Sequence, residues 1–253
     1  MDHNALLTLS TELGRRLMCS GAEISRVEDS IRRLMTAYGL SHAQVFAIPS
    51  CLIVSLTAPN GQPVTSLCRI PSHGIDLDLL ELCNATCRRL CLEVPDPELA
   101  LQMVKQIDMA RPRFSPVVIL MGHFLVGAFF TPFFGGGFAD SVCGGLCGLA
   151  IGLAAGVLKL LPDNHAFMNT LLCSSVASCL AQLLTHLGLA TNTDAVTIGA
   201  LMLLVPGVSL TTSMRDIVAN DTISGITRLA ESLLSATAIA IGVGTALALG
   251  RLM

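Results

Sequence analysis

The first 110 residues alternate between helical and strand patterns of apolar positions. Leucines at three- and four-residue steps mark the first helix, and short apolar runs around a turn signal mark a hairpin. Together these patterns predict two helices, three strands and two further helices, over residues 4–19, 23–38, 45–48, 51–57, 64–70, 76–92 and 96–109. We therefore expect a small α+β domain with an antiparallel sheet over residues 1–114.

The pattern changes from residue 115 to residue 253, where long apolar runs replace the amphipathic ones. Each run has about twenty residues, which is enough to cross a hydrocarbon core of roughly 30 Å as a helix. The predicted spans cover residues 117–134, 138–158, 167–187, 195–214 and 229–249. The fold class that follows is an α-helical polytopic membrane protein with about five transmembrane helices, preceded by a small cytosolic α+β domain.

The charge distribution supports this division. Only 13% of the residues are charged, about half the value typical of soluble domains. Residues 1–114 hold 11 of the 15 Lys and Arg, and the remaining residues hold 4. No cluster of basic residues suggests nucleic acid as a partner.

The same charges predict the orientation in the membrane. Basic residues precede the first span and occupy alternate connections, while the connections around 135–140 and 191–194 have none. These basic residues are Arg111, Arg113, Lys159, Arg215 and Arg228. The positive-inside rule then places the N-terminus in the cytoplasm and the C-terminus outside, although Arg251 opposes the rule. The first residues also lack the features of a signal peptide.

Small residues recur every four positions in two predicted spans. In the second span they are Gly144, Gly148, Gly152 and Gly156, and Ala240 and Gly244 belong to a similar series in the fifth. Such faces let two helices approach closely in lipid, so we expect them to be packing surfaces. A role in permeation is the alternative.

The fourth predicted span contains Pro206-Gly207, which should kink or open its helix. Transporters use broken helices to bind charged groups, and a polar run follows here. The candidate substrate-binding residues are Pro206, Gly207, Thr211, Thr212, Ser213, Arg215 and Asp216. A guanidinium such as that of Arg215 can hold a carboxylate by two parallel hydrogen bonds. The alternatives are a plain proline kink, and an Arg215 that anchors the loop and pairs with Asp216.

Two further ionisable residues are candidates for ion coupling. His123 is the one titratable residue of the first predicted span, and Glu231 lies near the start of the fifth. A neutral histidine bonded within the protein and a local pair between Glu231 and Arg228 are the alternatives.

The sequence contains little that suggests an enzyme or a cofactor. It has no Walker A motif, no Gly-x-Ser-x-Gly and no Cys-x-x-Cys. Cys83, Cys87 and Cys91 lie on one helix face, and buried thiols explain them better than a metal site does. We expect no catalytic residue, no metal and no cofactor.

Two segments carry a resemblance to a known family. Gly21, Ala22, Glu23, Arg26 and Glu28 stand in the pattern of the first signature of the bacterial threonine/serine exporters. The Leu-Val-Pro-Gly run ending at Gly207, with Arg215-Asp216, Asp221, Gly225 and Arg228, resembles the second signature.

The resemblance implies a transport function. Fused members of the family carry a second set of about five spans, so this chain resembles the larger subunit of the split form. That form works with a small integral membrane partner in the bacterial inner membrane. The resemblance implies export of threonine, serine or a succinate-type dicarboxylate by a homo- or hetero-oligomer. The alternative is a non-transporting regulatory or scaffold subunit with a ligand-sensing cytosolic domain.

Overall fold

The computed structural model describes residues 3–40, 42–57, 61–71, 74–112, 114–160 and 165–250. The chain forms two compact units. The N-terminal unit combines Met1–Pro112 with Val208–Leu229, and the membrane unit combines Arg113–Gly207 with Ala230–Met253. The segment 208–229 therefore belongs with the N-terminal unit, which the sequence division at residue 114 does not anticipate. Arg113 and Arg251, used above for orientation, lie outside the described residues.

The elements of residues 1–112 follow the predicted order. They are α1 (His3–Cys19), α2 (Ile24–Ala37), β1 (Gln44–Ile48), β2 (Cys51–Thr57), β3 (Pro63–Arg69), α3 (Leu77–Glu93) and α4 (Pro97–Ala110). The strands form an antiparallel sheet in the order β1-β2-β3, with Val45 opposite Val54 and Leu52 opposite Cys68. The hairpin between β2 and β3 is confirmed, while residues 58–60 of its turn lie outside the described part.

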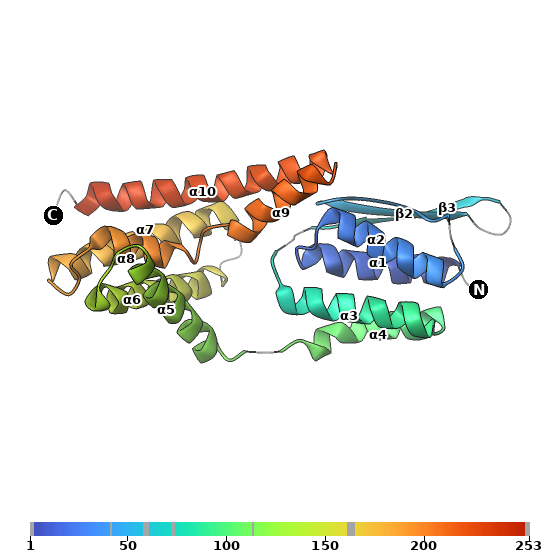
Figure 1. The fold of residues 1–253 in the computed structure, drawn as a ribbon, viewed down its shortest axis with the longest axis horizontal. Coiled ribbons are helices and arrows are strands. Elements are labelled where there is room, and N and C mark those ends of the chain that lie inside the picture. The colour runs from blue at the N-terminus through green and yellow to red at the C-terminus, as the bar shows by residue number, and fades with distance from the viewer. Residues whose placement is uncertain are drawn as a thin grey trace. The chain divides into compact units, whose positions relative to one another are not determined.

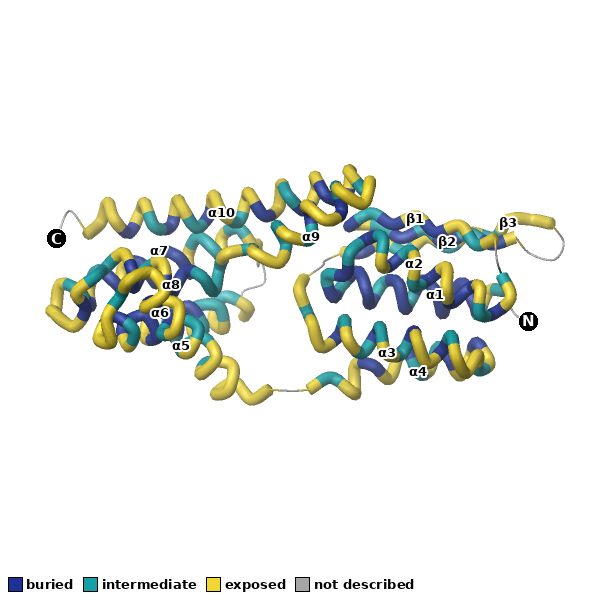
Figure 2. Tube along the Cα trace, in the orientation of Figure 1, coloured by how far each residue is buried: buried dark blue, intermediate teal, exposed yellow. Residues whose placement is uncertain are grey.

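These elements stack in three layers (Figure 1): the sheet, the pair α1 and α2, and the pair α3 and α4. Helix α1 lies in the middle layer and contacts both others. Its leucines, among them Leu6, Leu9, Leu13 and Leu17, are fully buried, as the dark tube of Figure 2 shows. Because α1 has neighbours on two sides, its buried surface is wider than one amphipathic stripe would be.

The membrane unit contains α5 (Pro116–Phe133), α6 (Phe138–Leu158), α7 (Ala166–His186), the short α8 (Thr193–Leu201) and most of α10 (Thr222–Gly250). Among the described residues, four helices are long and apolar enough to cross a membrane, namely α5, α6, α7 and α10. Large apolar side chains such as Phe129 and Phe138 are exposed on them. Exposed apolar surface of this extent fits lipid or a membrane partner.

The fourth predicted span is not one continuous helix. Helix α8 ends at Leu201, and α9 covers Gly207–Val218. Between them the Leu203 N–H donates to Ala200 O, a bond of the tighter i to i−3 type. Pro206 has no N–H to continue the helical ladder, which explains the break. The predicted break is confirmed, and the two helices on either side of it are 9 and 12 residues long.

Glycines bring α5 and α6 into backbone contact. A Cβ on Gly148 would lie 2.3 Å from the carbonyl oxygen of His123. Gly144 lies against Gly127 and Thr131, and Gly152 lies against the His123 ring. The structure thus places three of the four regularly spaced glycines of α6 against α5. A Cβ on Gly156 or on Gly244 would meet nothing within 4 Å, and Ala240 is exposed.

The contrast between Gly148 and Gly156 gives a matched test. We expect Gly148→Ala to lower the thermal unfolding midpoint of the purified chain in detergent by roughly 5 °C, because overpacking costs about 1–3 kcal/mol. Gly156→Ala should leave the midpoint unchanged, since its new methyl group meets open space. Equal midpoints for the two variants would show that the close approach of α5 and α6 does not depend on Gly148.

Candidate functional site

The two signature segments meet in the N-terminal unit. The first segment begins where the chain leaves α1 and turns into α2. Gly21 has a φ of +85°, and a Cβ there would lie 2.6 Å from Gly74 O, so this turn requires glycine. Ala22 is then buried, and α2 begins at Ile24.

Asp216 caps the start of α2. Glu23 occupies the N-cap position, but its side chain makes no capping hydrogen bond. The Ile24 N–H instead donates to Asp216 Oδ1 at 3.3 Å, across 192 residues of sequence. A carboxylate at this position also interacts favourably with the positive end of the helix dipole. Helix α9 therefore supplies the capping group that α2 lacks.

Arg228 of α10 completes this contact. Its Nη2 donates to Ala22 O at 2.7 Å, and its Nη1 lies 3.4 Å from Asp216 Oδ2. Asp216 is 1% exposed and Arg228 is 6% exposed. Burial raises the pKa of the Asp216 carboxyl, while Arg228 and the Ile24 N–H offset part of that rise.

A second ion pair lies at the edge of this contact. Arg215 Nη1 bonds to Glu23 Oε1, and the Arg215 side chain is 69% exposed. The alternative in which Arg215 pairs with Asp216 is therefore wrong, because each residue pairs with a different partner. We call the six residues Ala22, Glu23, Ile24, Arg215, Asp216 and Arg228 the motif junction.

The hairpin formed by α9 and α10 holds the second segment in place. The Asp221 N–H donates to Asp216 O at 2.9 Å, just before α10 begins. A Cβ on Gly225 would lie 2.7 Å from Ser213 O and 2.4 Å from an Ile217 side-chain carbon. Gly225 thus allows the two helices to approach closely enough for Asp216 and Arg228 to meet.

The last two residues of the first segment, Arg26 and Glu28, do not belong to the motif junction. Glu28 accepts a hydrogen bond from the Ala47 N–H at 3.0 Å and pairs with Arg32, four residues further along α2. Arg26 is exposed and makes no hydrogen bond or ion pair with any residue that the structure describes. It lines a cleft between α2 and α3.

Comparison with known proteins identifies the family of this chain. The family described as "Putative threonine/serine exporter" matches residues 8–250. The chain belongs to the threonine/serine exporter family. It is 21% identical over 262 residues to the threonine/serine exporter of Corynebacterium glutamicum, covering 100% of this chain and 53% of that relative. The chain thus spans about half the length of the curated relative it matches. No solved structure matches it.

The predicted substrate-binding residues of this family member lie on α9 and at the break before it. Thr211 and Thr212 both donate to Val208 O, and the buried Ser213 donates to Leu210 O at 2.8 Å. All three hydroxyls are therefore bonded within their own helix. Pro206 and Gly207 stand at the break itself. Substrate binding by this set stays a prediction.

Neither of the predicted coupling residues is among the six residues of the motif junction. His123 Nδ1 is 2.8 Å from Ile119 O of the same helix, and its ring lies against Gly152. Glu231 is exposed on α10. The contact of His123 matches the bonded histidine considered above, and a coupling role for either residue stays a prediction.

The structure adds Asp140, which the sequence analysis did not select. It is fully buried at the start of α6 and accepts from Gly137 N, Thr191 N, Thr191 Oγ1 and Asn192 N at 2.6–3.1 Å. The carboxylate therefore ties the turn before α6 to the connection between α7 and α8. An acidic residue in the first turn of an apolar helix was the available signal. Among the described residues, no group of three or more His, Cys, Asp or Glu could hold a metal ion.

The buried pair of the motif junction predicts a large effect on stability. Asp216→Ala should lower the free energy of unfolding by about 3–5 kcal/mol, because it leaves Arg228 as a buried charge without its carboxylate. Asp29→Ala removes the exposed pair with Arg33 and should cost less than about 1 kcal/mol. Denaturant unfolding of the two purified variants, followed by circular dichroism, gives both values. A similar decrease in the free energy of unfolding for the two variants would contradict the structural role of the buried pair.

Proposed function

We propose that this chain is the membrane subunit of a secondary exporter of small carboxylate metabolites, either threonine and serine or succinate-type dicarboxylates. The observation that carries the proposal is the family match over residues 8–250, together with four helices that could cross a membrane. The name of the Corynebacterium relative supports the amino acids as substrates. The substrates share a carboxylate, which fits the guanidinium proposed as their anchor.

A small integral membrane partner belongs to the same proposal. The match covers 53% of the curated relative, and the resemblance implies that fused members of the family carry a second set of spans. Exposed phenylalanines on α5 offer apolar surface that a membrane partner could cover. We place the assembly in the bacterial inner membrane with the N-terminus in the cytoplasm, because of the basic residues in the alternate connections.

Efflux measurements test the function directly. Cells loaded with labelled serine, threonine or succinate should release at least one of them several-fold faster when the chain is expressed together with a small membrane protein encoded beside it. The chain alone, the partner alone and an empty vector are the controls. Efflux equal to the empty vector for all three compounds in the paired cells would favour a regulatory or scaffold subunit.

Binding of the substrate carboxylate by Arg215 can be tested separately from the ion pair that Arg215 makes with Glu23. If Arg215 binds the substrate carboxylate, Arg215→Lys should lower efflux about tenfold, because the lysine loses the two parallel hydrogen bonds. Glu23→Gln should then keep or raise efflux, since it releases the guanidinium from its ion pair. Efflux is compared at matched membrane abundance.

The opposite pattern assigns Arg215 to the junction alone. In that case Arg215→Lys keeps near-normal efflux, because a charge alone preserves the contact with Glu23. Glu23→Gln and Arg215→Ala would instead reduce efflux to the same extent, since either change breaks the same pair.

A further inference from the structure

Arg26 is the signature residue whose place in the structure is not explained by packing. Gly21, Ala22 and Glu23 shape or join the motif junction, and Glu28 bonds to β1 and Arg32. Arg26 has no such contact within the described residues, although it belongs to the same segment. A long cationic side chain that is exposed and without an ion partner is available to a ligand.

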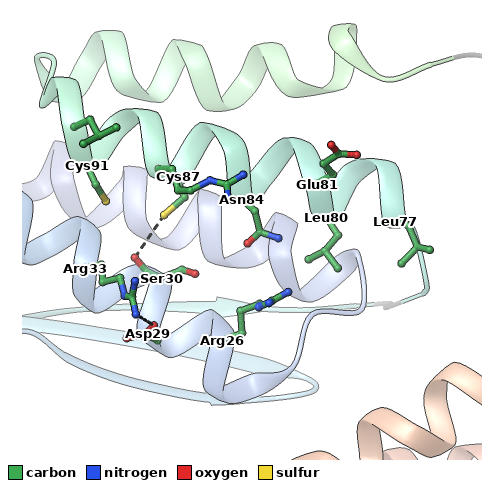
Figure 3. A pocket seen from close by; sticks show the side chains of 12 residues that line it. Arg26, Asp29, Ser30, Arg33, Leu77, Leu80, Glu81, Asn84, Cys87 and Cys91 are labelled. Carbon is green, nitrogen blue, oxygen red and sulfur yellow. Dashed lines mark hydrogen bonds and ion pairs between the residues drawn. The ribbon is translucent and has the colours of Figure 1, made fainter.

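The cleft that Arg26 lines has the size of a small-molecule site. Its volume is about 910 Å³, within the usual range of about 300–1,000 Å³ for such pockets. In Figure 3, Leu80 and Asn84 point from α3 toward α2, and Arg26 extends from α2 into the same space. The cleft therefore combines an apolar wall with an amide and a guanidinium, as binding sites for small polar molecules often do.

The charges of the cleft favour an anionic group. Arg33 is already paired with Asp29 at 2.9 Å. The remaining charged lining residues are Arg26 and Arg88, which are cationic, and Glu81, which is anionic. The two arginines lie on α2 and α3, so that the helices offer guanidinium groups from both walls. A guanidinium binds a carboxylate by a planar pair of hydrogen bonds.

We infer that the α2–α3 cleft is a binding site for a small carboxylate metabolite, with Arg26 as its anchor. None of the predicted substrate-binding residues lines the cleft, and a metabolite bound there regulates export through α2. Arg26 lies in the first turn of the helix whose N-terminus Asp216 caps. A ligand held between α2 and α3 therefore acts on the helix that carries the motif junction. Regulation of export rests on the proposed function, whereas binding in the cleft does not.

Hydrogen exchange of the full chain in detergent localises the binding. Succinate, serine and threonine are added in turn, at constant ionic strength, with inorganic phosphate as the comparison anion. We expect at least one carboxylate to slow exchange over residues 24–33 and 77–92. Arg26→Gln should lower the affinity for that ligand at least tenfold in the same titration. Arg89→Gln is the matched control, because Arg89 is a neighbouring arginine outside the cleft that pairs with Glu93.

Three results would overturn the proposal. No protection of the two helices by any carboxylate would show that the cleft is not such a site, and equal protection by phosphate would remove the carboxylate assignment. Unchanged binding in Arg26→Gln, with an unchanged unfolding midpoint, would exclude Arg26 as the anchor. Efflux is measured separately, so protection without efflux would leave the site standing while the exporter proposal fails.

Discussion

The buried charge pair between Asp216 and Arg228 is the interaction on which the N-terminal unit depends. Neither charge could be buried alone without a large desolvation cost. Each is paired with the other and bonds to one backbone group of the first signature, the Ile24 N–H or the Ala22 carbonyl. The pair therefore requires two segments 192 residues apart to meet. The pair therefore has two effects. It determines which part of the chain caps the N-terminus of α2, and it stabilises the N-terminal unit.

This constraint connects the fold to the proposed transport function. Helix α9 starts at the proline break, and α10 continues from the junction into the membrane unit. Helix α9 therefore leads to the break where we propose that substrate binds, and α10 leads to Glu231, a predicted coupling residue. Helix α2 is common to the junction and to the Arg26 cleft. Most residues of the family signatures thus form or support the motif junction, whereas Arg26 lines the cleft that we propose as a ligand site.

Local patterns predicted most of the elements, because helix and strand periodicity, proline and glycine act over a few residues. The ends of α6 and the break before α9 follow from such signals. The partners of Asp216 and Arg215 could not be predicted, since a contact between distant segments leaves no periodic trace in one sequence. The resemblance names five of the six junction residues, all except Ile24. Adjacency in sequence suggested a pair between Arg215 and Asp216, whereas in the structure Arg215 pairs with Glu23.

Hydrogen exchange along a denaturant series tests the central claim, that residues 208–229 fold as part of the N-terminal unit. The account predicts that 208–229 and 22–27 in the wild-type chain lose protection together, at one free energy of opening, because the buried pair joins them in one cooperative unit. If 208–229 opened at a lower free energy while 22–27 kept its protection, the buried pair would not hold the two segments together, and the account would be contradicted.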